Sequence, residues 1–317
     1  MVAMPSSGMF VASMGTIDEN WKLWDAASGA ERMVGARNDT GACICQVGDN
    51  APLKRCPAVA HTAGIDALTL SRCGHRLASA DSCGVVILWD AQTGEEERRM
   101  QIGRQLGHSM AFSVDGARLA CGGGDGSVYV FDATTGALLR SLGEEEYDVE
   151  WVQFSPANNS ILATVSNTTI TLWDVDSGEK TIRFAGTDFA VFSPDGRTIA
   201  TGASDVHLLD AETGELRLRL HGHQDSVSSV SFSVDGGSKL ASVSWDGACK
   251  VWDSSTGALI STIEVNAGIS SVSWGRDWVR NTKGAMAFAM GHRPRLGERS
   301  EVLALDAGVV RMILDRV

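Results

Sequence analysis

Long apolar runs and an excess of positive charge are both missing from this sequence of 317 residues. No stretch approaches the roughly 18 consecutive apolar residues that a membrane-spanning helix needs. The N-terminal residues MVAMPSSGMF lack the basic flank and apolar core of a secretory signal. A formal net charge of −12 argues against general binding to a phosphate backbone, which requires a basic face. We therefore expect a soluble protein with neither membrane insertion nor direct nucleic-acid binding.

Proline is scarce, and cysteine follows no recognisable framework. The seven cysteines are an odd number at irregular spacings, which suits a reducing compartment better than a set of disulfides. This favours a cytoplasmic protein, with the nucleus as the alternative and secretion excluded. With 35 glycines against 6 prolines, the turns are expected to be glycine turns, and a hydrophobic content of 44% allows a substantial core.

What the sequence does contain is a repeated punctuation. Runs that alternate at a period of two end in an apolar residue plus Asp, at spacings of 65, 42, 42, 36, 43 and 53 residues. The seven acids are Asp25, Asp90, Asp132, Asp174, Asp210, Asp253 and Asp306. After the first six, a Ser-Gly or Thr-Gly pair follows at the third and fourth residue. Glycine supplies the positive φ that such hairpins need, so the pattern predicts seven units of short strands.

The unit is best developed between His221 and Gly257, HGHQDSVSSVSFSVDGGSKLASVSWDGACKVWDSSTG. This stretch holds a Gly-His pair, three alternating runs, a Trp-Asp-Gly turn and the terminal Trp252-Asp253. It resembles one unit of the WD-repeat family, a four-stranded blade of a β-propeller. The resemblance implies an all-β fold, a seven-bladed WD-repeat β-propeller with four-stranded antiparallel blades. Because no blade buries both faces alone, a single domain over 1–317 is expected.

The first and last units depart from the pattern. Only Met1 to Met4 remain for the innermost strand of the first blade, which is expected to be incomplete. Residues 30–51 have no counterpart elsewhere and are interpreted as an insertion in the first blade. The last blade, 265–317, is irregular, with strands expected at 269–275, 285–291, 301–306 and 309–315. Two explanations of ring closure stay open: face packing between the last and first blades, or a chain that starts late.

Four residues of the best-developed unit have the chemistry of a hydrolase triad: His223, Ser242, Asp246 and Trp252. In WD repeats the matching positions form a buried network, in which Asp binds His, His binds the strand hydroxyl, and the hydroxyl meets the indole N–H. The resemblance therefore implies a structural tetrad, and the tryptophan argues against a nucleophile in a cleft. We expect no catalytic residues and no enzymatic activity.

The other units keep parts of this tetrad. The second has His61, Ser79 and Trp89, with Cys83 at the position of the Asp, and the fifth and seventh are expected to lack the tetrad. The sixth is therefore expected to be the most stable. The glycines of Gly122-Gly123-Gly124-Asp125-Gly126 lie between two strands, which favours a hairpin turn over a phosphate loop.

Two groups have metal-ligand chemistry, His221 with His223 and Asp225, and Cys43, Cys45 and Cys56 with His61. Neither has a recognised ligand spacing, and the histidines His61 and His223 match structural positions of the repeat. No metal and no cofactor is therefore predicted.

Candidate partner-binding residues lie in the loops between the runs. Tyr147 stands in an acidic loop, and Trp245 directly precedes the Asp of the tetrad. Aromatic side chains among charges are typical of binding surfaces. Acidic residues on the same rim would suit a basic peptide or tail, and Trp278 is a candidate on the opposite rim. The full set is Trp245, Tyr147, Glu144, Glu145, Asp148, Asp188, Asp225 and Trp278.

WD-repeat proteins are similar in acting as rigid, non-catalytic platforms for several partners. The resemblance therefore implies a scaffold or adaptor that binds other proteins through its rims and central funnel, as a subunit of a multiprotein complex. The alternative is a small-ligand-binding or enzymatic propeller that uses the central channel. It would need convergent polar residues at several blade tips, and a sequence does not display convergence.

Overall fold

The computed structural model describes residues 61, 63, 65–102, 109–143, 147–184, 189–233 and 235–264 with their side chains. Strands 2–3, 10–14, 21–25, 31–38, 41–46, 269–275 and 285–290, with residues 106–108 and 185, are described by backbone alone. Within these residues every regular element is a strand. The chain divides into two compact units, unit 1 (1–183) and unit 2 (184–317), which are described one at a time.

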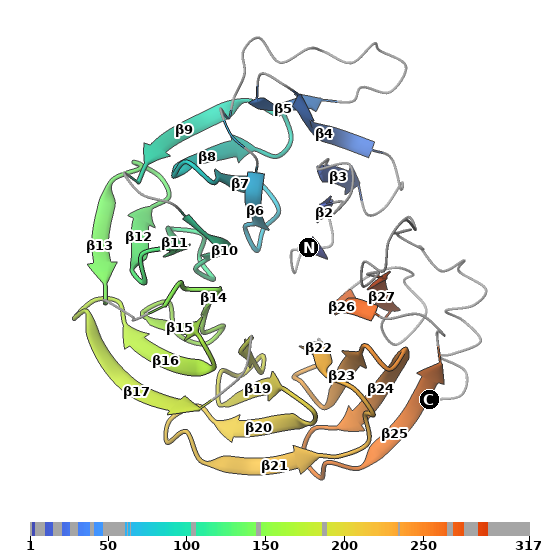
Figure 1. Cartoon of the computed structure of the whole chain (residues 1–317). Helices are drawn as coiled ribbons and strands as arrows, with labels where there is room; N and C mark the ends of the chain where they lie inside the picture. The colour runs from blue at the N-terminus through green and yellow to red at the C-terminus, as the bar shows by residue number, and fades with distance from the viewer. Residues whose placement is uncertain are drawn as a thin grey trace. The chain divides into compact units, whose positions relative to one another are not determined.

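The described part of unit 1 contains four sheets, and in each the strands lie in chain order (Figure 1). Sheet 1 is β1 (Val2–Ala3), β2 (Phe10–Met14), β3 (Trp21–Asp25), β4 (Glu31–Asn38) and β5 (Gly41–Gln46). Sheet 2 is β6 (Ile65–Leu70), β7 (Arg76–Asp81), β8 (Val85–Asp90) and β9 (Glu96–Gln101). Sheet 3 is β10 (Leu106–Phe112), β11 (Arg118–Gly123), β12 (Val128–Asp132) and β13 (Leu138–Leu142). Sheet 4 is β14 (Trp151–Phe154), β15 (Ile161–Ser166), β16 (Thr169–Asp174) and β17 (Glu179–Ala185).

The described part of unit 2 contains three sheets with the same chain order. Sheet 5 is β18 (Val191–Phe192), β19 (Thr198–Gly202), β20 (Val206–Asp210) and β21 (Leu216–Leu220). Sheet 6 is β22 (Val227–Phe232), β23 (Lys239–Ser244), β24 (Ala248–Asp253) and β25 (Leu259–Glu264). Sheet 7 is β26 (Ile269–Gly275) and β27 (Ala285–Met290).

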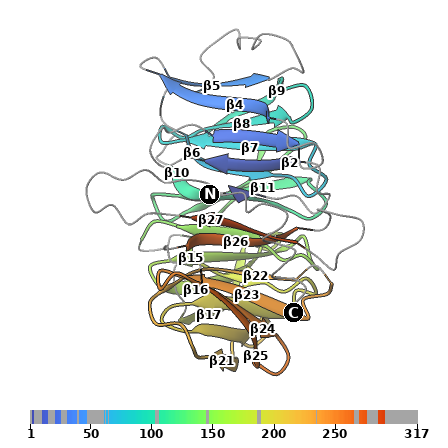
Figure 2. The same ribbon diagram turned by 90° about the vertical axis from the view of Figure 1, so that its right-hand side faces the viewer.

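The all-β, four-stranded repeat expected from the sequence is confirmed in sheets 2 to 6, whose strands lie where the alternating runs predict them. In sheet 1, β1 has two residues, and β4 and β5 form a hairpin that adds a fifth strand beside β4 (Figure 2). Most of the 30–51 stretch is thus part of sheet 1 itself. The strands predicted at 301–306 and 309–315 lie outside the described residues. The count of seven blades and the single domain stay predictions.

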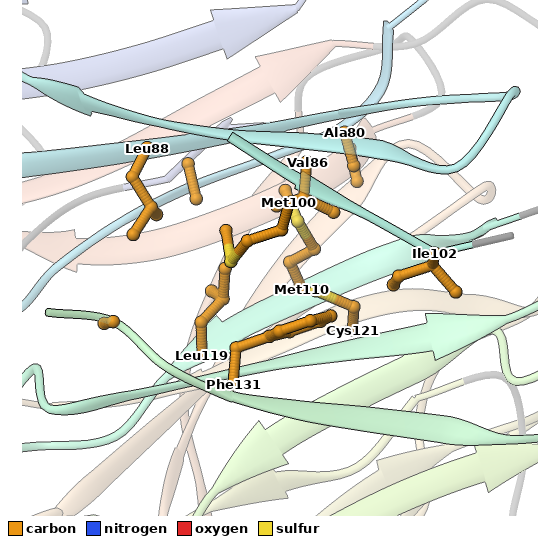
Figure 3. Close-up of a cluster of buried hydrophobic side chains, with 12 residues drawn as sticks. Ala80, Val86, Leu88, Met100, Ile102, Met110, Leu119, Cys121 and Phe131 are labelled. Atoms are coloured by element: carbon orange, nitrogen blue, oxygen red, sulfur yellow. The ribbon is translucent and has the colours of Figure 1, made fainter. Parts of the chain in front are cut away.

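Sheet 3 shows why the strands of a unit differ in composition. β11, RLACGG, buries five of its six residues, whereas β13, LLRSL, buries only Leu142. Sheets 2 and 4 both pack against sheet 3, so its middle strands are covered on two faces and are composed of small and apolar residues. Between sheets 2 and 3, Met100 of β9 lies in one cluster with Met110, Cys121 and Phe131 of sheet 3 (Figure 3). The core of unit 1 therefore lies between sheets rather than within any one of them.

Side chains of one sheet also hold the turn of the next. In unit 1 the guanidinium Nε of Arg98 donates to the carbonyl of Thr134 at 2.9 Å, and Arg140 donates to the carbonyl of Asp176 at 2.6 Å. In unit 2 the corresponding contact is apolar, because Leu218 and Leu220 pack beside Gly257. Sheets 2 and 3, sheets 3 and 4, and sheets 5 and 6 are thus each joined through the fourth strand of the first sheet of the pair.

In sheets 2 to 6, the Asp that ends the third strand builds the turn that follows it. The Oδ1 atom of Asp253 accepts the backbone N–H groups of Ser255 at 3.0 Å and Thr256 at 2.8 Å, and Gly257 closes the turn at φ 74°. Hydrogen bonds from the Ser255 side chain and the Thr256 backbone lower the pKa of Asp253 to about 2. Corresponding bonds form at Asp90, Asp132, Asp174 and Asp210. The punctuation seen in the sequence is therefore a set of carboxylate-capped turns.

This arrangement predicts a specific acid sensitivity. Because the folded pKa of Asp253 lies below the usual value of about 3.9, its stabilising effect is present above about pH 4 and is lost as pH falls towards 2. Asp253→Asn should lower the free energy of unfolding at pH 7, and the difference from wild type should shrink between pH 4 and pH 2. Urea denaturation at several pH values measures this, with Asp148→Asn as a control for loss of one exposed charge. A difference that stays constant with pH would show that ionisation of Asp253 does not stabilise the turn.

Candidate functional site

The residues with catalytic chemistry in sheet 6 form one chain of hydrogen bonds. The Nδ1 atom of His223 lies 2.9 Å from Asp246 Oδ2, and its Nε2 atom lies 2.7 Å from Ser242 Oγ. The indole N–H of Trp252 donates to the same Oγ at 2.8 Å. The structure thus brings His223, Ser242, Asp246 and Trp252 together.

Burial decides what this chain of bonds can do. Ser242 is 0% exposed and Trp252 2% exposed, and the hydroxyl is held between an indole and an imidazole. A nucleophile needs a substrate carbonyl within reach and donors for the developing oxyanion. A fully enclosed hydroxyl that already accepts the Trp252 N–H meets neither requirement. The geometry is that of a structural bridge between β23, β24 and the loop before β22.

The charges of the bridge are set by its surroundings. Burial lowers the pKa of His223, and it does so against the opposing influence of the Asp246 carboxylate, which favours the protonated ring. For Asp246, burial would raise the pKa, but the N–H groups of Gln224 and Ala248 and the His223 ring outweigh it and lower the pKa. A neutral imidazole therefore faces an ionised carboxylate. Because the pKa values of His223 and Asp246 are both lowered in the folded state, protonation of either group at acidic pH reduces the free energy of unfolding.

Sheet 2 contains a second complete bridge, and this corrects the sequence interpretation. His61 Nδ1 lies 3.0 Å from Asp81 Oδ2, His61 Nε2 lies 2.7 Å from Ser79 Oγ, and Trp89 donates to that Oγ at 2.8 Å. Cys83 was predicted to stand in place of the acid, but its side chain is exposed.

Asp81 supplies the carboxylate from two residues earlier in the chain. The N–H groups of Cys83 and Val85 donate to Asp81 Oδ1 at 3.0 and 2.9 Å. Burial alone would raise the pKa of Asp81, but hydrogen bonds from His61 and from Val85 lower it overall. His61 and Asp81 are both fully buried. The sixth repeat is therefore not alone in having a full bridge.

Among the side chains that the structure describes, sheet 4 keeps one bond of the bridge, and sheets 3 and 5 show none. In sheet 4 the indole N–H of Trp173 donates to Thr164 Oγ1 at 3.0 Å. In sheet 3 the buried Cys121 takes the hydroxyl position, and burial raises the pKa of its thiol above the usual range. In sheet 5 the Thr201 hydroxyl donates to the carbonyl of Phe189 at 2.8 Å instead. In sheet 5 the strand hydroxyl thus bonds to a backbone carbonyl rather than to a histidine.

The glycine-rich stretch after β11 is a hairpin turn. Gly123 donates its N–H to the carbonyl of Ser127 at 2.7 Å, and its own carbonyl accepts the N–H of Val149 at 3.0 Å. A Cβ atom on Gly122 would lie 2.6 Å from the Val149 carbonyl oxygen, so the close approach of the two segments requires glycine. The N–H groups of Gly123 and Gly126 donate within this turn, which favours a hairpin over a phosphate loop.

The histidines with metal-ligand chemistry already have partners within the protein. His221 Nδ1 lies 3.0 Å from Asp205 Oδ2, while both ring nitrogens of His223 and of His61 are engaged in the bridges. Cys43, Cys45 and Cys56 have no described side chains. Within the side chains that the structure describes, no group of three or more His, Cys, Asp or Glu residues could hold a metal ion.

The candidate partner residues of unit 1 lie at the start of sheet 4. Tyr147 is 52% exposed, and Asp148 and Glu150 are exposed beside it. The backbone of this segment is fixed to β15, because Ser166 Oγ donates to the Tyr147 carbonyl at 2.8 Å. We call Tyr147, Asp148 and Glu150 the Tyr147 surface. Glu144 and Glu145 lie outside the described residues.

The candidate residues of unit 2 lie where loop 221–226 meets the turn between β23 and β24. Trp245 is half-buried, and its backbone N–H donates to the Ser226 carbonyl at 3.1 Å. Ser244 Oγ donates to the Asp225 carbonyl at 2.9 Å. Gln224 and Asp225 are exposed. We call Trp245, Gln224 and Asp225 the Trp245 surface. The backbone contact from Ser244 had no signal in the sequence beyond a serine at a strand end.

Two further candidates, Asp188 and Trp278, lie outside the described residues. Among the described residues, no helix has the length and hydropathy to cross a membrane.

The segments that match a known protein family coincide with the repeats described above. The family model for the WD40 repeat, described as "WD domain, G-beta repeat", matches residues 54–90, 102–132 and 214–253. The third match contains the sheet 6 bridge and the first contains the sheet 2 bridge. These three segments of the chain thus match the WD40 repeat. The all-strand sheets of the chain are consistent with a WD-repeat propeller.

Proteins similar to this chain include a periodic tryptophan protein 2 homolog from Dictyostelium discoideum, 30% identical over 206 residues. Guanine nucleotide-binding protein β subunits from Zea mays and Arabidopsis thaliana are 27% and 28% identical over 202 and 218 residues. These alignments cover 60%, 57% and 62% of this chain. They span 22% of the first relative and 53% and 58% of the other two.

The second bridge gives a direct test of which residue supplies its acid. Asp81→Ala should lower the free energy of unfolding by about 1–3 kcal/mol, since it leaves the buried His61 ring without its partner. Cys83→Ser is the matched variant: only its backbone N–H contacts Asp81, so its effect should stay within about 0.5 kcal/mol. Urea denaturation of both variants measures the difference. A larger loss for Cys83→Ser than for Asp81→Ala would reverse the assignment.

Proposed function

We propose that this protein is a non-catalytic scaffold or adaptor that holds other proteins as a subunit of a multiprotein complex. The observation that supports the proposal is that the serine hydroxyls with triad-like neighbours have structural roles. Ser79 and Ser242, the hydroxyls with triad-like neighbours, are both 0% exposed and bonded on two sides. The two hydroxyls that resemble nucleophiles are thus engaged in structural hydrogen bonds.

The exposed residues support binding instead. Each unit presents an aromatic side chain and at least one exposed carboxylate on a segment whose backbone is fixed by hydrogen bonds. A rigid backbone reduces the conformational entropy lost on binding, and aromatic residues are common hot spots. The Tyr147 and Trp245 surfaces are therefore our proposed partner sites.

The chemistry of the Tyr147 surface favours a basic peptide or tail. Both of its charged residues, Asp148 and Glu150, are exposed carboxylates, and the whole chain has a net charge of −12. Long-range attraction would bring a cationic segment to this surface, and the tyrosine ring would contact its aliphatic stems. A central funnel, the single-domain organisation and a cytoplasmic or nuclear location are further parts of the proposal that rest on the sequence.

Substitution of the two aromatic residues tests the proposal. Tyr147→Ala and Trp245→Ala should keep the melting temperature close to wild type and reduce recovery of the proteins captured by the full-length chain about tenfold. Quantitative affinity purification with mass spectrometry measures recovery. Asp246→Ala is the control, because it should lower the melting temperature through the sheet 6 bridge.

Equal recovery with folded Tyr147→Ala and Trp245→Ala would remove both surfaces from the proposal. A chain that remains monomeric in its native extract, and is stabilised by a small metabolite in a thermal-shift screen, would instead support the ligand-binding alternative.

A further inference from the structure

The chain has two tyrosines, and they have opposite environments. Tyr129 is half-buried, packs against the core between sheets 2 and 3, and donates its hydroxyl to Asp125 Oδ2 at 2.7 Å. Tyr147 is 52% exposed and lies in the segment before β14, outside the strands. An enzyme that modifies a tyrosine hydroxyl could reach Tyr147, whereas Tyr129 would have to leave the core.

The surroundings of Tyr147 have the charge pattern of a kinase substrate. In the sequence it follows Glu144-Glu145-Glu146 and precedes Asp148, and the structure shows Asp148 and Glu150 exposed next to it. Protein kinases select substrates partly through such charge patterns, so a kinase with a basic substrate groove would be attracted to this segment.

The backbone after Tyr147 is anchored while its side chain is presented. The Tyr147 carbonyl accepts the Ser166 hydroxyl, and the N–H of Val149 donates to the Gly123 carbonyl at 3.0 Å. These bonds hold the main chain against sheets 3 and 4 and leave more than half of the tyrosine surface in solvent. A phosphate on the ring would extend into water, so folding and modification do not conflict.

We propose that Tyr147 is a phosphorylation site for a tyrosine kinase that prefers acidic residues around its target. The phosphoryl donor is ATP with Mg²⁺. The bond between Tyr147 Oη and the γ-phosphorus forms as the bond from that phosphorus to the β–γ bridging oxygen breaks. ADP leaves with the electron pair of the broken bond, and the hydroxyl proton passes to the catalytic aspartate of the kinase.

Phosphorylation would change what the Tyr147 surface binds. It adds about 1.5–2 negative charges and three strong acceptor oxygens beside Asp148 and Glu150. Guanidinium and ammonium groups bind phosphate through short, charge-assisted hydrogen bonds. The modification would therefore strengthen binding of a basic segment. This consequence rests on the proposed function, whereas the modification itself does not.

The modification is tested on the full-length protein with Mg²⁺-ATP and a tyrosine kinase of acidic preference, followed by intact mass measurement and peptide mapping. The expected result is one phosphate per chain on Tyr147. Tyr147→Phe should abolish incorporation, and the matched variant Tyr129→Phe should retain it. Absence of phosphate while a control peptide is modified, or phosphate on Tyr129, would overturn the inference.

The consequence is tested by the affinity of both forms for a synthetic peptide rich in lysine and arginine. Phosphorylation should tighten binding about tenfold at low salt, and 0.5 M salt should remove most of that gain, since screening is then strong. Equal affinities of the two forms would overturn the regulatory part. Failure of the unmodified chain to bind any partner would instead count against the proposed function.

Discussion

The indole N–H of Trp252 donates to the hydroxyl of Ser242, and the local structure of sheet 6 depends on that bond. It turns a serine inside a buried strand into an acceptor and directs the serine proton to His223, which lies against Asp246. The loop before β22, β23, the turn after it and β24 are joined without a buried unpaired polar side-chain atom among the four residues. Since an unsatisfied buried polar group costs about 1–3 kcal/mol, each member of the bridge depends on the others.

The bridge of sheet 6 also helps to hold the backbone of the proposed Trp245 surface. Its loop, residues 221–226, is held by the backbone bond from Trp245 to Ser226, and Val227 directly after the loop donates its N–H to the Ala203 carbonyl, so the exposed side chains stand on a rigid base. In unit 1 the Ser166 and Val149 bonds give Tyr147 a comparable base without any histidine. The polar groups of the bridges are buried and those of the proposed partner surfaces are exposed, which is consistent with a protein-interaction scaffold.

The strands of sheets 2 to 6 could be predicted because the Asp and Ser/Thr-Gly turns mark where each third strand ends. Asp81 was missed, because Cys83 precedes the turn glycine Gly84 as Asp246 precedes Gly247. A carboxylate two residues earlier reaches the same imidazole nitrogen, and only geometry reveals this. The exposure of Tyr147 and the anchoring of Trp245 depend on tertiary contacts of Ser166 and Ser226, which carry no sequence signature.

Hydrogen exchange at the tryptophan indoles tests the central claim most directly. If Ser79, Thr164 and Ser242 are structural acceptors, then the indole N–H groups of Trp89, Trp173 and Trp252 should exchange as slowly as the protected amides of the middle strands. Nuclear magnetic resonance of protein labelled with ¹⁵N-tryptophan would measure each rate. Exchange at the rate of free indole would show that these hydroxyls are open to solvent and would contradict the account.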